Sequence, residues 1–345
     1  MAHSLTGPGP ATHNLRPLTV KKRQSIINHK ESSIRKRMQK EEFYMRRALQ
    51  LAANGAGHVS PNPMVGAVIV EPSGKIIGEG WHRRYGGPHA EVNAFRSVRQ
   101  EDEHLIPEST IFVTLEPCSH YGKTPPCALL LKEKGIRRAV IGTGDPNPKV
   151  AGRGIRILRE AGIEVVEDVL KDECIWINRR FMTAQLLRRP WIQLKWAQTA
   201  DGEMKVPADA APDERLIIST PLTMTLMHRE RAMTDAIMVG TGTLLADNPS
   251  LTTRLWPGRN PRPVIFASPR IAAGVDSNGA PLKALKNAII LDPKESLERN
   301  MHKLYEEYGI TSLMVEGGPT LLHSFIAANL YDEQRIETSS ARKIF

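Results

Sequence analysis

Two series of short apolar strands alternate with helices along this chain, and the segment Arg188-Arg189-Pro190 separates them. Strands that alternate with helices of this length predict layered α/β domains in which the later strands run parallel. In the first series we expect a helix from Glu41, strands at 65–70, 75–82, 110–115, 138–143 and 164–169, and helices at 89–98, 125–135, 154–161 and 171–187. In the second we expect strands at 191–198, 236–242, 262–268, 287–292 and 312–318.

The length and the cysteine count narrow the class of protein. A chain of 345 residues suits two domains of roughly 150 residues each. It has no uninterrupted apolar run of about 18–20 residues, which a membrane helix needs. Three cysteines cannot form a disulfide framework, so they are available for metal binding or catalysis in a reducing compartment. We therefore expect a cytoplasmic protein.

The net charge of +10 is concentrated at the N-terminus. Residues 1–37 carry eight Lys and Arg residues against the single acid Glu31, which leaves residues 38–345 with 39 basic and 36 acidic side chains. The body of the protein is therefore nearly neutral, and neither nucleic acid nor a membrane is an expected partner. The basic tail shows no sustained apolar face, so we expect residues 1–37 to be disordered.

Three interpretations of the tail are open: a transit peptide for organellar import, an arm that binds nucleic acid, and translated upstream sequence without a role. We favour the third, because Met38 stands directly before the first amphipathic helix and is the natural start.

The most informative cluster consists of Pro88-His89-Ala90-Glu91, Glu116-Pro117-Cys118 and Pro125-Pro126-Cys127. One imidazole and two thiolates give Zn²⁺ three ligands and leave a fourth position for water, the arrangement of a catalytic site. Expected helix starts at His89 and Cys127 favour the thiolate form of cysteine. Glu91, two residues after His89, can reach the site and carry a proton from water to leaving ammonia.

Isolated cysteines are often core residues, and we assign Cys174 to packing. Besides an enzyme in which both domains are catalytic, two hypotheses stay open: a deaminase of RNA or of a free base whose second domain only binds substrate, and a non-catalytic protein with structural zinc. The carboxylate of Glu91 argues against the latter, since a structural site closes its fourth position with a ligand.

Four strings, PNPMVGAVIV, GWHRRYGGPHAEVNAF, TLEPCSHYGKTPPC and GTGDPNPKVAGRG, closely resemble the bifunctional deaminase–reductase family of riboflavin biosynthesis. Eight residues separate Cys118 from Cys127, whereas nucleoside, nucleotide and tRNA deaminases usually have two. The resemblance extends from about Met38 to Glu333. It implies a cytidine-deaminase-like three-layer domain at 38–187 and a dihydrofolate-reductase-like domain at 190–345.

The resemblance also implies two reactions. The first is zinc-dependent hydrolytic deamination of 2,5-diamino-6-(5-phosphoribosylamino)pyrimidin-4(3H)-one. The second is NADPH-dependent reduction of the ribosyl group of 5-amino-6-(5-phosphoribosylamino)uracil to ribityl. In the first domain, His89, Cys118 and Cys127 match the zinc ligands and Glu91 the proton carrier. The implied substrate contacts are Asn62, His82, His120, Lys123 and Asn147.

In the second domain, VGTGTLLADNPSLTTR (239–254) and VEGGPTLLHSF (315–325) each place a glycine-rich turn between a strand and a helix. Backbone N–H groups at such turns bind a dinucleotide phosphate, although ordinary tight turns look the same. By resemblance, the NADPH contacts are Ala197, Thr243, Asp247, Gly318, Pro319, Thr320, Leu321, Leu322, His323 and Ser324. The implied substrate contacts are Arg231, Leu251, Arg254 and Glu316.

The chain departs from the family pattern in three places. Ile217 stands where the family commonly has Trp, and Phe266 where Asp is usual. The chain also stops at Phe345, where the family's reductase domain continues, so we expect an incomplete second domain. The alternative function is then an active deaminase with impaired reductase activity. The family pattern further implies a homodimer or tetramer formed through the reductase domain.

Overall fold

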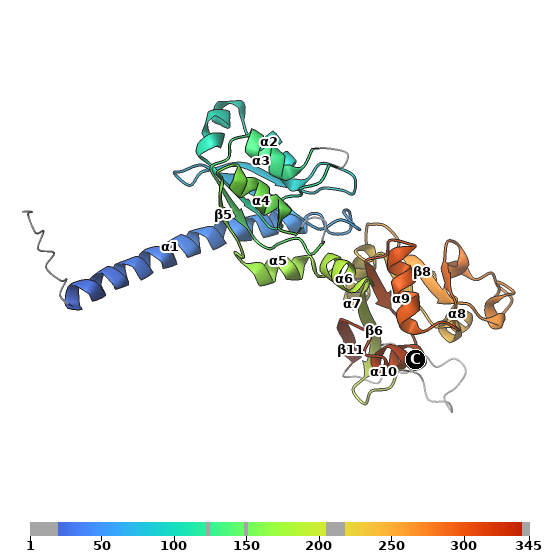
Figure 1. Ribbon diagram of the computed structural model, residues 1–345. Helices are drawn as coiled ribbons and strands as arrows, with labels where there is room; N and C mark the ends of the chain where they lie inside the picture. Colours follow the sequence, from blue (N-terminus) through green and yellow to red (C-terminus); the bar gives the residue numbers. More distant parts are fainter. Residues whose placement is uncertain (1–19, 122–124, 148–150, 205–217, 340–345) are drawn as a thin grey trace, which may run out of the picture. The chain divides into compact units, whose positions relative to one another are not determined.

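The fold is an α/β architecture with two separate sheets (Figure 1). A computed structural model describes residues 20–121, 125–147, 151–204 and 218–339. Among the helices of this part, none combines the length and apolar character that a bilayer crossing demands. Most of residues 202–218, including Ile217, fall outside the described ranges.

Helix α1 runs from Val20 to Ala53 and corrects our expectation for the N-terminal region. We expected disorder through residue 37 and a helix only from Glu41, whereas residues 20–37 are helical. The physical reason lies in composition: the helix contains neither Gly nor Pro and is rich in Lys, Arg, Gln and Glu, which favour helices. Residues 1–19 of the expected tail lie outside the described part.

The first sheet has the strand order β2-β1-β3-β4-β5. Strand β1 pairs antiparallel with β2, as the expected hairpin requires, and also with β3, while β3, β4 and β5 run parallel. The strands are β1 (Gly66–Val70), β2 (Ile76–Trp81), β3 (Thr110–Val113), β4 (Arg138–Ile141) and β5 (Glu164–Val166). All five expected strands are confirmed.

Helices cover both faces of this sheet and make it the middle of three layers. Side chains alternate along β3, so that Ile111 and Val113 join one apolar core and Phe112 joins the other. The first core lies under α2 (Ala90–Ser97), α3 (Cys127–Glu133) and α4 (Arg153–Glu160). The second lies under α1 from Tyr44 onward and under α5 (Lys171–Ile177). A 3-10 helix, η1 (Gln100–Glu108), precedes β3.

The single helix expected at 171–187 is two helices, α5 and α6 (Arg179–Leu187), which meet at Asn178. Asn178 has φ −101° and ψ 14°, outside the helical range, and its side chain bonds to the backbone of Met64 instead. Tertiary hydrogen bonding therefore interrupts a helix that the sequence alone makes continuous. Helix α6 ends at Leu187. The next residue, Arg188, has φ 57°, and the expected break between the two series follows.

The second sheet has six parallel strands in the order β11-β6-β10-β7-β8-β9. Five of them match expected strands, while β11 was not expected. The strands are β6 (Trp191–Thr199), β7 (Ala236–Met238), β8 (Arg262–Phe266), β9 (Ile289–Leu291), β10 (Ser312–Val315) and β11 (Glu333–Ser339). Between them lie α7 (Pro221–Ala232), α8 (Thr241–Asp247), η2 (Pro269–Ile271), η3 (Lys283–Leu285), α9 (Leu297–Glu306) and α10 (Pro319–Ala327).

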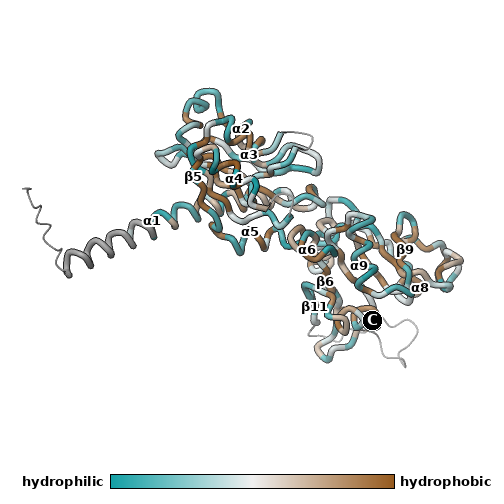
Figure 2. The backbone as a smooth tube through the Cα atoms, viewed as in Figure 1, coloured by the Kyte–Doolittle hydropathy of each residue, from teal (hydrophilic) through white to brown (hydrophobic). Residues whose placement is uncertain are grey.

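Two apolar cores flank the second sheet as well. One packs β6, β7 and β10 against α9 and α10, and the other packs β7 and β8 against α8, η2 and η3. Figure 2 shows apolar stretches along the strands of both sheets. Central parallel strands covered on both faces have nearly continuous apolar sequences, as Ala236–Met238 and Leu313–Val315 do here.

We predict that Gly66→Ala destabilises the first domain by about 2 kcal/mol, because of overpacking. A Cβ at Gly66 would lie 1.9 Å from the carbonyl oxygen of Ala48 and 2.8 Å from the amide nitrogen of Ala52, so helix α1 and strand β1 would have to separate. Urea unfolding of the full chain measures the loss. Gly242→Ala is the control, since a Cβ there meets no atom within 4 Å. Equal midpoints for wild type and Gly66→Ala would contradict the packing described here.

Asp235 gives the second domain a pH-dependent contribution to stability. Its carboxylate accepts hydrogen bonds from the Thr311 amide (3.0 Å), the Thr311 hydroxyl (2.7 Å) and the Ser312 amide (3.1 Å), and it pairs with Arg259. Burial raises the pKa of Asp235, but Arg259 and these hydrogen bonds outweigh burial and hold the pKa below its ordinary value. Because the folded pKa is lowered, the contribution is present at neutral pH and disappears as pH falls through that pKa.

We therefore predict that Asp235→Asn lowers the free energy of unfolding at pH 7 by about 2 kcal/mol. The difference in the free energy of unfolding between this variant and wild type should shrink once the pH falls below about 4, where Asp235 in the unfolded chain begins to protonate. Urea titrations of both proteins at several pH values measure it. A difference that stays constant with pH would show that the charge of Asp235 does not contribute.

Candidate functional site

Four segments of the first domain meet at one edge of its sheet. Strands β2, β3 and β4 end there, and β1, which runs the opposite way, begins there. Parallel strands of α/β sheets bring their carboxyl ends together, and ligands bind at that edge. The loops that follow β2, β3 and β4 and the segment before β1 therefore enclose one site.

Three potential metal ligands come from these segments. His89 is the residue immediately before α2, Cys118 follows β3, and Cys127 is the first residue of α3. Pro126 directly precedes Cys127 with φ −57°, a value that its ring favours and that leads into the helix. Both helix starts direct the positive end of a helix dipole at the site.

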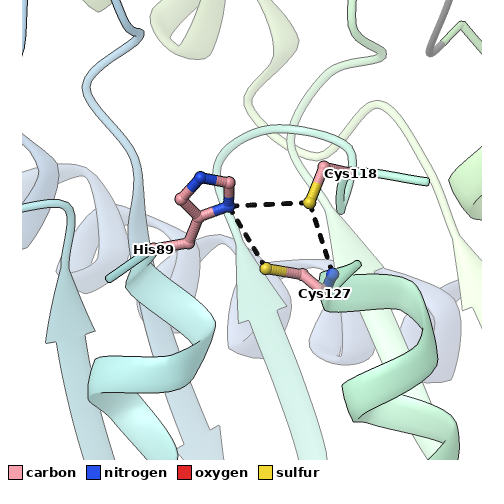
Figure 3. Close-up of side chains that lie close together, drawn as sticks. All are labelled: His89, Cys118 and Cys127. Carbon is pink, nitrogen blue, oxygen red and sulfur yellow. Dashed lines mark hydrogen bonds between the residues drawn. The ribbon is translucent and has the colours of Figure 1, made fainter. Parts of the chain in front are cut away.

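The three side chains converge on one point (Figure 3). His89 Nδ1 lies 3.3 Å from Cys127 Sγ and 3.6 Å from Cys118 Sγ, and all three donor atoms lie within 4.8 Å of one another. With Zn–N near 2.0–2.1 Å and Zn–S near 2.3 Å, a tetrahedral ion separates its N and S ligands by roughly 3.5 Å. The spacing and the donor set therefore fit Zn²⁺ with one coordination position to spare.

Of the three donor groups, Cys118 is held in the form that binds a metal cation, whereas His89 and Cys127 each have to release a proton when an ion binds. Hydrogen bonds from Cys127 and then from His89 lower the pKa of Cys118 to about 4, so this sulfur is a thiolate, the form that binds metal. The Cys127 amide adds a hydrogen bond to the same sulfur at 3.3 Å. The hydrogen bond with Cys118 raises the pKa of His89 to about 9, and the pKa of Cys127 is raised by its hydrogen bond with Cys118 and by burial.

Glu91 is buried beside the three donor atoms, on the first turn of α2. Only 3% of the residue is exposed, and burial raises the pKa of its carboxyl group. Its carboxylate belongs to the wall of a cavity of about 560 Å³ that His89 and Cys118 also line. Glu91 therefore shares the cavity with two of the three residues that can bind a metal.

The same cavity is lined by four of the five residues predicted to contact substrate in this domain: Asn62, His82, His120 and Asn147. Asn62 Nδ2 lies 3.2 Å from His82 Nε2, and His82 Nδ1 lies 3.0 Å from the Pro88 carbonyl oxygen. The rings of His82 and His89 meet edge to face, with centroids 5.5 Å apart. His120 is exposed, and Lys123 lies outside the described residues.

Two residues of the cavity wall were not singled out from the sequence. Asp145, within GTGDPNPKVAGRG, lines the cavity, and burial raises the pKa of its carboxyl group. Glu116 is buried and accepts backbone hydrogen bonds through both oxygens, which tie the β3 loop to the loop before α4. Its donors are Asp145 (3.3 Å), Gly152 (3.0 Å), Gly154 (2.9 Å) and Ile155 (3.3 Å). Glu116 belongs to the motif TLEPC, but no spacing of residues in a sequence indicates that a carboxylate will bind only backbone amides.

In the second domain the two glycine-rich turns lie next to each other. They follow the neighbouring parallel strands β7 and β10 and lead into α8 and α10. A Cβ on Gly318 would be 3.8 Å from Thr243 Oγ1, and one on Gly240 would be 3.9 Å from Leu321 Cβ. Backbone amides at two such helix starts favour a phosphate. Ala197 lies past the last β6 residue that pairs with β10, toward the same edge of the sheet.

The remaining residues predicted for the second domain differ in what they can offer a ligand. Asp247, Pro319, Thr320, His323 and Ser324 are exposed, whereas Leu322 and Leu251 are buried. Arg231 donates to both oxygens of Glu316, at 2.9 and 2.6 Å, and to the Thr252 carbonyl oxygen at 3.1 Å. This pair occupies much of the Arg231 guanidinium, while the exposed Arg254 is accessible to a phosphate.

Together, an N,S,S donor set with a buried glutamate and a second parallel α/β domain with paired glycine-rich turns define a deaminase joined to a reductase. Family models agree: residues 38–143 match the cytidine and deoxycytidylate deaminase zinc-binding region, and residues 190–340 match the RibD C-terminal domain.

Relatives extend the match over most of the chain. The riboflavin biosynthesis protein RibD of Aquifex aeolicus is 36% identical over 322 residues, which cover 88% of this chain and 87% of that protein. The crystal structure of a diaminohydroxyphosphoribosylaminopyrimidine deaminase/5-amino-6-(5-phosphoribosylamino)uracil reductase from Thermotoga maritima is 39% identical, covers 85% of each chain and has a TM-score of 0.74. Acinetobacter baumannii RibD is 30% identical over 88% of each chain, with a TM-score of 0.77.

This chain belongs to the RibD family. It is a bifunctional riboflavin-biosynthesis enzyme with a zinc-dependent deaminase domain and an NADPH-dependent reductase domain. The expected fold class, function and cofactors are thereby confirmed.

We predict that Cys118→Ser lowers the zinc content well below one ion per chain and destabilises the first domain, since metal binding and folding are coupled. Elemental analysis and thermal melting with and without a chelator measure both effects. Cys174→Ala is the matched control: this buried cysteine lies in the core between the sheet and α5, so the variant should keep its zinc. Full zinc content in Cys118→Ser would contradict the site.

Proposed function

We propose that the first domain deaminates 2,5-diamino-6-(5-phosphoribosylamino)pyrimidin-4(3H)-one. The second domain then reduces the ribosyl group of 5-amino-6-(5-phosphoribosylamino)uracil to ribityl. The convergence of His89, Cys118 and Cys127 beside Glu91 in one cavity is the observation that carries the proposal. The T. maritima relative, whose name states both activities, supports these substrates.

In the deamination, His89, Cys118 and Cys127 hold the zinc ion, which supplies Lewis-acid activation of water. Water adds its oxygen to the amino-bearing ring carbon, the carbon–nitrogen bond breaks, and the nitrogen leaves as ammonia. Glu91 takes a proton from the water and delivers it to the leaving nitrogen. Its burial keeps bulk water from competing for that proton.

The cavity wall supports a polar substrate with a phosphate. Asn62, His82 and Asn147 offer amide and imidazole groups to the pyrimidine. The exposed His120 is followed three positions later in the sequence by Lys123, whose cationic group suits the phosphate.

In the reduction, NADPH held in the second domain would supply the hydride that converts the ribosyl group to ribityl, and a proton from solvent would complete the ring oxygen as a hydroxyl. The chain's residues orient the two reactants and exclude water. We assign the dinucleotide to Ala197, Thr243, Asp247 and the turn 318–324. We assign the ribose phosphate to Arg254, with Arg231, Leu251 and Glu316 as the neighbouring substrate contacts. The adjacency of the two glycine-rich turns supports this placement.

We further propose a cytoplasmic enzyme whose ligands are small molecules rather than nucleic acid, which the near-neutral charge of residues 38–345 supports. Assembly as a homodimer or tetramer through the reductase domain is part of the same proposal.

We predict that Glu91→Ala lowers the rate of deamination by about 10²–10⁴-fold, the usual contribution of a positioned proton carrier. The zinc content should stay at one ion per chain. Ammonia release measures the first effect and elemental analysis the second. NADPH oxidation with the deaminated intermediate, followed in the same sample, is the internal control and should not change. Loss of zinc from Glu91→Ala would show that Glu91 is a ligand and refute its role.

A further inference from the structure

Asn178 connects the break between α5 and α6 to the backbone of Met64, a residue 114 positions earlier in the chain. Its side-chain oxygen accepts the Met64 amide at 2.7 Å, and its side-chain NH₂ donates to the Met64 carbonyl oxygen at 2.8 Å. Only 2% of Asn178 is exposed. One buried amide therefore satisfies both backbone groups of Met64, and neither contact takes part in the metal site.

The segment held in this way borders the cavity. Pro61, Asn62 and Pro63, which line the cavity wall, directly precede Met64. Neither proline has an N–H group, so the segment can be held by few backbone donors of its own. The Asn62 amide bonds to the Val59 carbonyl oxygen at 2.9 Å on the N-terminal side. On the C-terminal side, Met64 is held by Asn178.

The contacts continue from this segment toward the donor atoms. Asn62 reaches His82 at 3.2 Å, and the His82 ring packs edge to face on His89. The His82 amide also bonds to the carbonyl oxygen of Val65, the residue after Met64, at 2.9 Å. A shift of Met64 would therefore displace Asn62 and His82, which line the cavity, more directly than it would displace the two cysteines.

We propose that Asn178 is a positioning residue of the deaminase site: by holding Met64, it sets the place of Asn62 and thereby the affinity for the pyrimidine substrate. Asparagine is suited to this role because its short planar amide presents one acceptor and one donor side by side, which matches a backbone amide and carbonyl. The proposal rests on the proposed deamination, since the affected quantity is substrate binding in that cavity.

The test compares Asn178→Ala and Asn178→Asp with wild type in the full-length zinc enzyme. Aspartate keeps the size and the acceptor for the Met64 amide but places a second oxygen against the Met64 carbonyl. We expect both variants to raise KM for the diaminopyrimidine by about tenfold, the effect of losing about one net hydrogen bond between the displaced Asn62 and the substrate, with a smaller change in kcat. Zinc content and NADPH-dependent reduction should stay at wild-type values.

Asn300→Ala is the matched control. Asn300 is a fully buried asparagine of the second domain whose side-chain NH₂ donates to the carbonyl oxygens of Asp292, Glu295 and Ser296. Its loss should reduce stability by a similar amount without changing KM for deamination. A KM in Asn178→Ala equal to that of wild type, or an equal rise in Asn300→Ala, would overturn the proposal.

Hydrogen exchange provides a readout that does not depend on activity. Exchange of a peptide that contains the Met64 amide should accelerate in Asn178→Ala and not in Asn300→Ala, and unchanged exchange would overturn the proposal. Wild-type protein that releases no ammonia from the diaminopyrimidine would reject the proposed substrate instead. Exchange at Met64 would then still decide whether Asn178 holds the segment.

Discussion

The convergence of one imidazole and two sulfurs on a single point is the constraint on which the first domain depends. His89 is 29 residues from Cys118 and 38 from Cys127, so local structure alone cannot bring the three together. The sheet does so because β2 and β3 end at the same edge, and α2 and α3 begin there. His89 and Cys127 are held at helix starts, and Cys118 lies in the loop after β3, where the Cys127 amide bonds to its sulfur.

The segments around the ligands are held by side chains that bind backbone rather than metal. Glu116 accepts four backbone amides of residues 145–155 and fixes the loop that carries Asp145 and Asn147. Asn178 does the same for the segment before β1. Buried polar groups are stable only when their hydrogen bonds are made, so these two side chains leave their loops few alternative positions. A preorganised cavity wall is the result.

The second domain applies the same geometry to a different ligand. Its parallel strands β6, β7 and β10 end at one edge, where the glycine-rich turns present backbone amides instead of thiolates. Phosphate recognition by helix starts requires little more than exposed N–H groups, which explains why the sequence alone did not distinguish these turns from ordinary ones. Family resemblance, and not spacing, identified them.

The sequence was sufficient to predict those parts of the fold and of the site that local patterns determine. Strand periodicity placed the strands β1 to β10, and the order of His89, Cys118 and Cys127 with helix-start signals indicated the zinc site. It was insufficient where contacts between distant residues decide. The helix break at Asn178 coincides with its bonds to Met64, and the role of Glu116 depends on backbone amides 29 to 39 residues later. Helix α1 begins at Val20 because residues of high helix propensity continue through the basic segment for which we expect disorder.

X-ray absorption spectroscopy at the zinc edge of the purified enzyme tests the central claim most directly. The account predicts one zinc per chain with two sulfur neighbours at about 2.3 Å and two nitrogen or oxygen neighbours at about 2.0–2.1 Å. A shell with no sulfur, or with sulfur at all four positions, would contradict the assignment of His89, Cys118 and Cys127 as ligands beside an open position.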